Sequence, residues 1–433
     1  MKKLNAYPVY LILEGSSSFL FALAFTFNLV YQTTVAGLSP LQLVLVGTTL
    51  ESSVFLFEVP TGIVADVYSR RLSILIGVFL IGLGIALEGS FPLFITILLA
   101  QVLWGIGYTF TSGATQAWIT DEIGEQAAGP AFLRASQAGQ VGGLLGIAVS
   151  MALANVRVNL PIVTSGLLFL LLGGFLLLFM PELGFKPTPR EQRNTWQSIA
   201  QTFRGGLGMV RRRPALLTIL AVGLFYGLYS EGFDRLWVKL ILDNFSLPQL
   251  GELKPVIWFG IINASGLLLS MFATEITRRR LDTNSPSAIT RGLLGLSAGL
   301  IAGLVTFALS GSFLVALLAL WVIDVTRSVI SPIYTTWVNQ RLDSQVRATV
   351  ISMSSQVDAI GQIAGGPALG LIGNMFSVRA AIGAAALLLS PVLAIYLRAI
   401  QRNREAPIGM PQGMEEPGAL ETSQDCQEDF VNL

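Results

Sequence analysis

Seven carboxylates lie inside long apolar stretches of the 433-residue chain, where a charge would be surrounded by lipid or protein. A charged side chain at the centre of a bilayer is costly, so an acid in such a place is by default a candidate for binding protons or substrate. The chain has no histidine, so carboxylates would have to carry any proton within the membrane. These candidates are Glu14, Glu51, Glu58, Glu231, Asp234, Asp324 and Asp358.

The acids of the first half have few basic neighbours. Glu14 and Glu51 have no Lys or Arg nearby in their own or the adjacent stretch. Glu51 and Glu58 are two helical turns apart, on one face and roughly 10 Å apart along the axis. A carboxylate without a basic partner in a low-dielectric medium is protonated much of the time. This property suits a proton carrier or a receptor for a cation, although a protonated acid bonded to a neighbouring helix is the structural alternative.

The second half mixes acids with bases. Glu231 precedes Arg235 by four residues, the favourable order for an ion pair on a helix, and Asp324 lies one turn before Arg327. Internal pairing of this kind would give a purely structural network. However, the acids outnumber the bases, so one carboxylate should remain without a partner.

Composition shows which elements must position these groups. Hydrophobic residues make up 53% of the chain and charged residues only 12%, with a mean hydropathy of +0.67, whereas soluble domains carry about 25% charged residues. The sequence therefore predicts an all-α polytopic membrane protein with twelve transmembrane helices in two six-helix bundles. The expected spans are 8–31, 41–65, 72–87, 92–118, 132–154, 160–179, 215–242, 255–274, 292–309, 313–338, 348–372 and 378–400.

The spans divide the chain into four parts. We expect an N-terminal bundle at 1–180, a cytoplasmic linker at 181–214, a C-terminal bundle at 215–400 and a disordered acidic tail at 401–433. Within the linker, 195–210 could form an amphipathic surface helix or remain flexible. Most of the 27 basic residues fall on the side that holds both termini, which predicts cytoplasmic termini by the positive-inside rule.

The turn between the second and third spans carries the most specific motif. Gly62, Asp66, Arg70 and Arg71 match in type and spacing the loop G-x-x-x-D-x-x-G-R-[KR] between helices 2 and 3 of major facilitator superfamily transporters. The chain resembles this family over about residues 5–400. Val67 departs from the family pattern, which usually has a basic residue there.

The resemblance implies that this turn is a cytoplasmic gate. In the family, the Asp of the loop pairs with the loop Arg and with an acid at the end of helix 4, which Asp121 or Glu122 would supply here. Glu275 and Arg279 repeat the spacing of Asp66 and Arg70 in the second half, as a duplicated bundle would. Read without the family, the Arg pair anchors the topology and the Asp caps the next helix.

Within the family, the Glu-Val-Pro-Thr-Gly lead-in at 58–62 and the many buried acids look most like bacterial drug-efflux proteins of the tetracycline or macrolide type. This resemblance implies a monomeric, proton-coupled antiporter of the bacterial inner membrane that exports a lipophilic drug, either neutral or cationic. Drug pumps often use acids on helices 7 and 10, which favours Asp234 or Asp324 as the free carboxylate. Gln101 stands where many antiporters have an Arg, so an Arg relay on helix 4 is not expected.

Other functions remain open at this stage. A symporter or facilitator for a metabolite or lipid would have the same architecture. A membrane enzyme or a transport-dead sensor is the alternative from another class, but the sequence has no nucleophile–base set, metal-ligand cluster or phosphate loop. We therefore expect no enzymatic activity, no cofactor and no metal. A net charge of +1 gives no indication of nucleic-acid binding.

Overall fold

The computed structural model describes residues 3–187, 214–249, 251–282, 285–340 and 344–405, and these residues form helices and short connections without a strand. The expectation of an all-α fold is confirmed. The predicted surface helix at 195–210 and the acidic tail from residue 406 lie outside the described residues. Residues 401–405, expected to begin the tail, continue the last helix instead.

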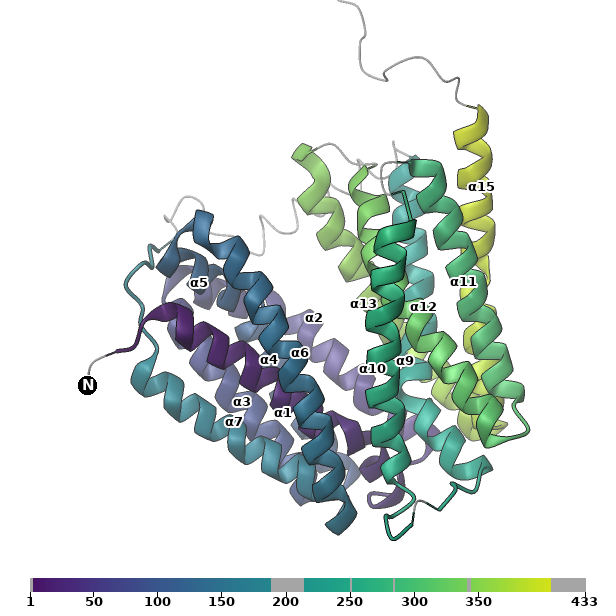
Figure 1. Cartoon of the computed structure of the whole chain (residues 1–433), viewed down its shortest axis with the longest axis horizontal. Coiled ribbons are helices and arrows are strands. Elements are labelled where there is room, and N and C mark those ends of the chain that lie inside the picture. Colours follow the sequence, from purple (N-terminus) through teal and green to yellow (C-terminus); the bar gives the residue numbers. More distant parts are fainter. Residues whose placement is uncertain (1–2, 188–213, 250, 283–284, 341–343, 406–433) are drawn as a thin grey trace, which may run out of the picture.

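The first half of the chain forms one bundle, coloured purple to blue in Figure 1. Its long helices pack on one another around buried side chains from α1, α3, α5, α6 and α7. The helices are α1 (Ala6–Thr34), α2 (Pro40–Val67), α3 (Arg70–Ser90), α4 (Phe94–Thr111), α5 (Ala114–Ile123), α6 (Glu125–Val156) and α7 (Leu160–Phe179).

The second half forms a separate bundle, teal to yellow in Figure 1. Here α9 packs closely on α13 and α14, and α12 packs on α10 and α11. The helices are α9 (Pro214–Asn244), α10 (Ile257–Arg280), α11 (Pro286–Leu309), α12 (Phe313–Gln340), α13 (Ser344–Met375), α14 (Val378–Leu389) and α15 (Pro391–Glu405).

Eleven helical segments of the described chain are long and apolar enough to cross a membrane. The remaining expected span corresponds to α13, which is less apolar because Gln356, Asp358 and Gln362 fall within it. The expected fourth span is two helices, since Gly113 adopts a φ of 70° and breaks the segment between α4 and α5. The twelfth span is likewise divided, before Pro391.

The third span is longer than expected at both ends. The sequence placed it at 72–87, but α3 begins at Arg70 and ends at Ser90. Ser69 caps its start, because the Ser69 hydroxyl accepts a hydrogen bond from the Leu72 amide at 2.9 Å. At the other end, Glu88 is helical and only 3% exposed. A carboxylate expected just outside the span is therefore inside the bundle.

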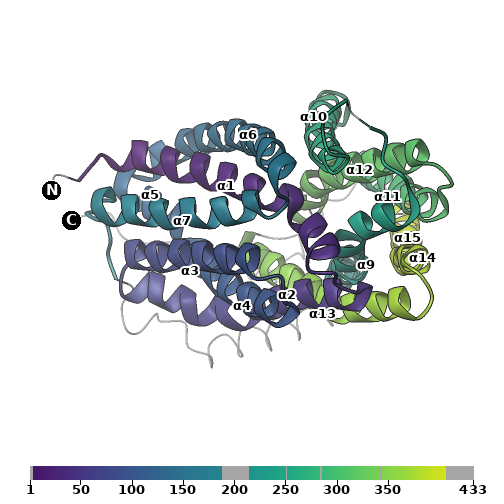
Figure 2. The same cartoon turned by 90° about the horizontal axis from the view of Figure 1, so that it is seen from below.

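We call the two ends of the molecule the terminal end and the distal end. The terminal end holds the start of α1, the end of α15 and the turn at Tyr68–Ser69, and the distal end holds the turns at 35–39, 157–159 and 310–312. The bundles contact each other mainly through α2 on α13 and α9, and α6 on α10. In Figure 1 the two bundles converge at the bottom, which is the distal end, and diverge toward the top. Figure 2 views the molecule from below and shows α2, α9 and α13 side by side.

Hydrogen bonds between the bundles reinforce the distal contact. The Lys254 amide donates to Asn155 Oδ1 at 3.0 Å, and the Lys254 ammonium donates to the Val156 carbonyl at 2.8 Å. On the other side of the interface, the Leu41 amide donates to Asn374 Oδ1 at 3.3 Å. The described conformation is thus closed at the distal end.

Candidate functional site

The turn at the terminal end brings together only part of the expected gate. The Arg70 guanidinium forms an ion pair with Asp121 and donates to the Ala117 carbonyl at 2.6 Å. Asp66 is exposed and has no ion pair within the described residues. Gly62 faces open space, where an added Cβ would have nothing within 4 Å. The Arg70–Asp121 pair therefore links the α2–α3 turn to α5 without Asp66.

Two acids bind the segment after α7 to this region: Glu182, which the sequence did not indicate, and Glu122, which was expected as a possible acid of the gate. Glu182 accepts from the Ser69 hydroxyl at 2.7 Å and from the Arg71 amide at 2.8 Å, so it lies at the amino end of α3. Glu122 accepts from the Leu183 and Gly184 amides at 2.5 and 2.6 Å. The start of the expected linker is consequently fixed to the first bundle.

The repeat of the motif in the second half is not part of a contact between bundles in this conformation. Glu275 pairs with Arg279 at 2.6 Å and with Arg278 at 2.7 Å, both on its own helix, α10. All three side chains are exposed. Because the bundles diverge at this end, the last turns of α10, which carry this repeat, lie apart from α3 and α5 (Figure 1).

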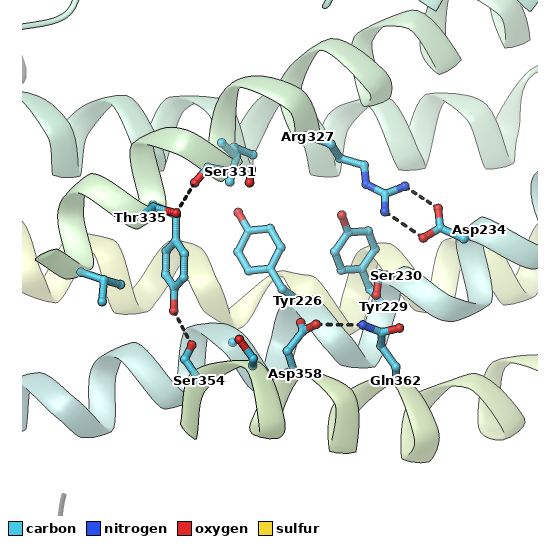
Figure 3. Close-up of a pocket in the computed structure, with 15 residues that line it drawn as sticks. Tyr226, Tyr229, Ser230, Asp234, Arg327, Ser331, Thr335, Ser354, Asp358 and Gln362 are labelled. Carbon is cyan, nitrogen blue, oxygen red and sulfur yellow. Dashed lines mark hydrogen bonds and ion pairs between the residues drawn. The ribbon is translucent and has the colours of Figure 1, made fainter. Parts of the chain in front are cut away.

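The second bundle contains a cavity of about 470 Å³ between α9, α12 and α13. Its wall is polar and aromatic, with three tyrosines, four serines, a threonine and a glutamine. Figure 3 shows the Tyr226 and Tyr229 rings between the helix that carries Arg327 and the helix that carries Asp358. A site of this size and lining can hold a small organic molecule.

An ion pair forms one end of this cavity. Arg327 on α12 makes a two-pronged contact with Asp234 on α9, with Arg327 Nη2 2.8 Å from Asp234 Oδ2. The guanidinium also lies over the Tyr229 and Phe233 rings, at 6.0 and 5.7 Å from their centroids. Asp234 is thus neutralised across helices, and Arg327 does not pair with Asp324, its neighbour on α12.

Two of the candidate acids in the second bundle have no basic partner within the described residues. Asp358 accepts a hydrogen bond from Gln362 at 2.8 Å and lines the cavity. Asp324 faces Asn263 and Gly266 of α10 in a smaller hollow on the other side of Arg327. The sequence argument expected one free carboxylate, Asp234 or Asp324, whereas the structure leaves Asp324 and Asp358 free. Lys239 pairs with Asp243 at 3.2 Å and so does not neutralise either of them.

The Glu231–Arg235 pair of α9 lies at the contact between bundles. Its atoms Glu231 Oε1 and Arg235 Nε are 2.9 Å apart, and the two side chains are 6% and 15% exposed. They pack over Gly47 of α2, where a Cβ would overlap both of them. Glu51 is four residues further along α2 and so lies on the same face of that helix as Gly47.

The remaining expected acids lie elsewhere. Glu58 is exposed and accepts a hydrogen bond from Gln356 of α13 at 3.1 Å, so it connects the two bundles on the terminal side of Glu51. Glu14 is half-buried in α1 and has no hydrogen bond or ion pair in the part of the chain that the structure describes. Neither residue lines the cavity of the second bundle.

Glu88 is the buried acid that the sequence reading missed. Gln32 of α1 donates to Glu88 Oε1 at 2.6 Å, and Gln101 of α4 donates to Glu88 Oε2 at 2.9 Å. The available signal was Gln101 within the fourth expected span and Gln32 directly after the first, since a buried amide needs a polar partner. Because the expected third span ended at Leu87, Glu88 was not considered as that partner.

The chain thus forms two helical bundles that meet at one end, and the second bundle contains a polar cavity. The family model described as the Major Facilitator Superfamily matches residues 11–366, and the chain belongs to this superfamily. An uncharacterized MFS-type transporter, YxaM of Bacillus subtilis (strain 168), is 25% identical over 362 residues, which cover 82% of this chain and 86% of the relative.

Solved structures share the fold at low identity. The nucleoside transporter NupG matches with a TM-score of 0.71 and 16% identity, over 93% of this chain and 100% of that one. A bacterial homologue of the human lysosomal transporter Spinster, in an inward-facing and unoccupied conformation, matches with a TM-score of 0.69 and 16% identity, over 92% of this chain and 98% of that one. These likenesses establish the fold alone.

Proposed function

We propose that this protein is a proton-coupled secondary transporter that exports an amphiphilic organic cation by alternating access. The observation that carries the proposal is Asp358, a carboxylate without a basic partner in the described chain, in the wall of a cavity lined by tyrosine rings. Because Arg327 and Asp234 neutralise each other, the cavity keeps a net negative charge. Aromatic faces and a carboxylate together attract cations.

The conformation supports a role in alternating access. The bundles are joined by hydrogen bonds at the distal end and diverge toward the terminal end (Figure 1). Basic residues concentrate at the terminal end, which supports a cytoplasmic position for that end by the positive-inside rule. The described state is then inward-facing, with the substrate cavity of the second bundle reached from the cytoplasm.

The same orientation leads us to propose where the protein lies in the cell and how its parts move. We place the chain in the bacterial inner membrane as a monomer with both termini cytoplasmic. Residues 1–180 and 215–400 act as the two rocking bodies, joined by the linker at 181–214 and followed by the tail at 401–433. The Arg70–Asp121 pair serves the terminal-end gate, and Asp66, Arg71, Glu275 and Arg279 join it when that end closes.

Exchange of a proton for the cation is the coupling step. A proton and an organic cation compete for one half-buried carboxylate, because either of them neutralises its negative charge. Protons entering from outside would displace the cation outward, and the proton would leave to the cytoplasm. Asp358 and Asp324 are the carboxylates of the second bundle that are free for this exchange.

The test uses purified protein in liposomes with ethidium, a planar aromatic cation, as the probe. With the vesicle interior acidified, we expect ethidium to accumulate as protons leave, and a protonophore to abolish the accumulation. Asp358→Asn keeps the shape of the side chain and should lose the transport. Ethidium transport that is unchanged by the protonophore would refute proton coupling.

A second candidate is uptake of a polar metabolite. It is favoured by the hydroxyl and amide groups of Ser230, Tyr334, Ser354 and Gln362 in the cavity wall, which suit a substrate with several hydrogen-bonding groups. The fold is also that of a nucleoside transporter. Accumulation of radiolabelled uridine or a dipeptide, with ethidium not transported, would select this function.

A further inference from the structure

The Arg327–Asp234 ion pair lies between two spaces of the second bundle. Both residues line the cavity that contains Asp358, and both also line a hollow of about 90 Å³ that contains Asp324. A larger hollow of about 330 Å³ extends from Asp324 and Arg327 along α10. The ion pair is therefore the boundary between the main cavity and the spaces around Asp324.

Arg327 has a second acid close to it on its own helix. Asp324 precedes Arg327 by three residues on α12, a spacing that places two side chains next to each other on one helix face. The Asp324 carboxylate lies against Gly266 of α10, where an added Cβ would be 2.9 Å from Asp324 Oδ2. Because this glycine has no side chain, the space beside Asp324 stays open.

The present contact of Arg327 with Asp234 is open to solvent. The two side chains are 31% and 41% exposed, and water weakens an ion pair that it can reach. The hollow of about 330 Å³ beside Arg327 and Asp324 has room for a guanidinium group, since one water molecule occupies about 30 Å³. Arg327 can therefore exchange Asp234 for Asp324 and still face a carboxylate.

The partner of Arg327 determines the charge of the main cavity. In the described conformation Arg327 neutralises Asp234, and Asp358 is the cavity acid that has no basic partner within the described residues. If Arg327 moves to Asp324, Asp234 becomes a second anion in the wall of the same cavity. The cavity then offers two negative groups to a substrate.

The aromatic wall shows where a substrate with two charges would be affected. In the view of Figure 3, the Tyr229 ring lies between Asp358 and the Asp234–Arg327 pair, and the Arg327 guanidinium is 6.0 Å from the centroid of that ring. A flat cation beside Tyr229 can place one charge toward Asp358. A second positive charge that extends toward Asp234 would be repelled by the Arg327 guanidinium for as long as Arg327 stays there.

We propose that Arg327 has two alternative partners, Asp234 and Asp324, and that its transfer to Asp324 allows the cavity to bind doubly charged organic cations. The inference rests on the cation export proposed above and names a substrate class for the same site. Asp324 is a positioning residue for this class of substrate, because it acts by holding Arg327 away from Asp234. Singly charged cations bind with Arg327 in its present position.

The experiment compares two dyes that share one ring system. Ethidium has a single positive charge, whereas propidium carries the same phenanthridinium ring and a second, quaternary ammonium group. Their fluorescence gives the equilibrium Kd of each dye for the purified full-length protein at one pH. The measured quantity is the ratio of the ethidium Kd to the propidium Kd, because a loss of folded protein affects both dyes alike.

Replacing the two partners should move this ratio in opposite directions. Asp324→Asn should lower it about tenfold, because Arg327 then remains on Asp234 and repels the second charge. Arg327→Gln leaves Asp234 free and should raise the ratio. Asp324→Glu keeps the carboxylate and should resemble the parent. Glu252→Gln is the control, since it removes an exposed acid of the connection between α9 and α10.

The outcomes distinguish this inference from the proposed function. An Asp324→Asn protein with the parental ratio overturns the inference, even if ethidium transport by the parent is driven by the proton gradient. An Arg327→Gln protein with a lowered ratio, or an Asp324→Glu protein that behaves as Asp324→Asn, overturns it as well. If the ratios change as expected but ethidium transport ignores the protonophore, the proton coupling is refuted and the selection by charge stands.

Discussion

The fit between Gly47 and the Glu231–Arg235 pair predicts that one methyl group will open the distal end. In Gly47→Ala, the new Cβ would overlap both the Glu231 carboxylate and the Arg235 guanidinium. These side chains are 6% and 15% exposed and bonded to each other, so they have little room to move aside. Overpacking of this kind costs about 1–3 kcal/mol. Since the overlap exists only when the bundles touch, we expect the closed-to-open equilibrium to shift by about 5- to 150-fold toward the open form.

Spin labels on the distal turns at 157 and 311 measure this shift as a change in the fraction of the longer distance. Gly143→Ala is the matched control, because a Cβ there has nothing within 4 Å and the residue also lies in a transmembrane helix, α6. We expect the control to resemble the parent. A Gly47→Ala protein with the parental distribution would show that the Glu231–Arg235 pair is not packed against α2 and would refute the reasoning.

Three further predictions concern the ion pairs and the cavity. Asp358→Asn should lower ethidium transport in liposomes by about tenfold or more, because a hydrogen bond to a charged group contributes about 1.5–3 kcal/mol; unchanged transport would exclude Asp358 from the site. Arg327→Lys should lower the melting temperature in detergent, since a lysine cannot make the two-pronged contact with Asp234. The double variant Asp234→Asn, Arg327→Gln should recover much of this loss, because it leaves neither charge without its partner. Arg70→Asp should destabilise the first bundle by about 0.5–1 kcal/mol, a modest loss because the Arg70–Asp121 pair is partly exposed. Adding Asp121→Arg should restore the melting temperature. A double variant without this recovery would argue against a direct pair.

The sequence was informative where spacing along one helix decides the contact. The Glu231–Arg235 pair follows from a separation of four residues, and the Glu275–Arg279 pair has the same spacing. The link between Arg70 and Asp121 was expected from the family loop, and the structure brings those two residues together. Asp66, expected in the same contact, is exposed instead in this conformation.

Contacts between helices could not be derived from one sequence. Arg327 is one turn from Asp324 yet binds Asp234, because the choice depends on how α9 and α12 face each other. The spacing of Asp324 and Arg327 on α12 therefore did not predict correctly which acid lacks a basic partner. The spacing of residues within α12 contains no information about the neighbouring helix.

Glu88 was omitted from the candidate acids because the end of the third span was placed too early. Hydropathy alone ended the third span before Glu88, because an acid raises the cost of extending an apolar segment. In the folded bundle, Gln32 and Gln101 compensate for the buried carboxylate, so the helix continues to Ser90. Polar residues of three different spans must be considered together to see this, and their proximity is a property of the tertiary fold.

The segment that follows α7 belongs physically to the first bundle, which matters for anyone who wishes to produce the protein as two separate polypeptides. A cut at residue 180 would remove Glu182 from the amino end of α3 and leave Glu122 without the Leu183 and Gly184 amides. The first fragment should therefore extend at least through Gly184. It also follows that tension on the connecting chain acts on α3 and α5, beside Arg70, and not on the end of α7.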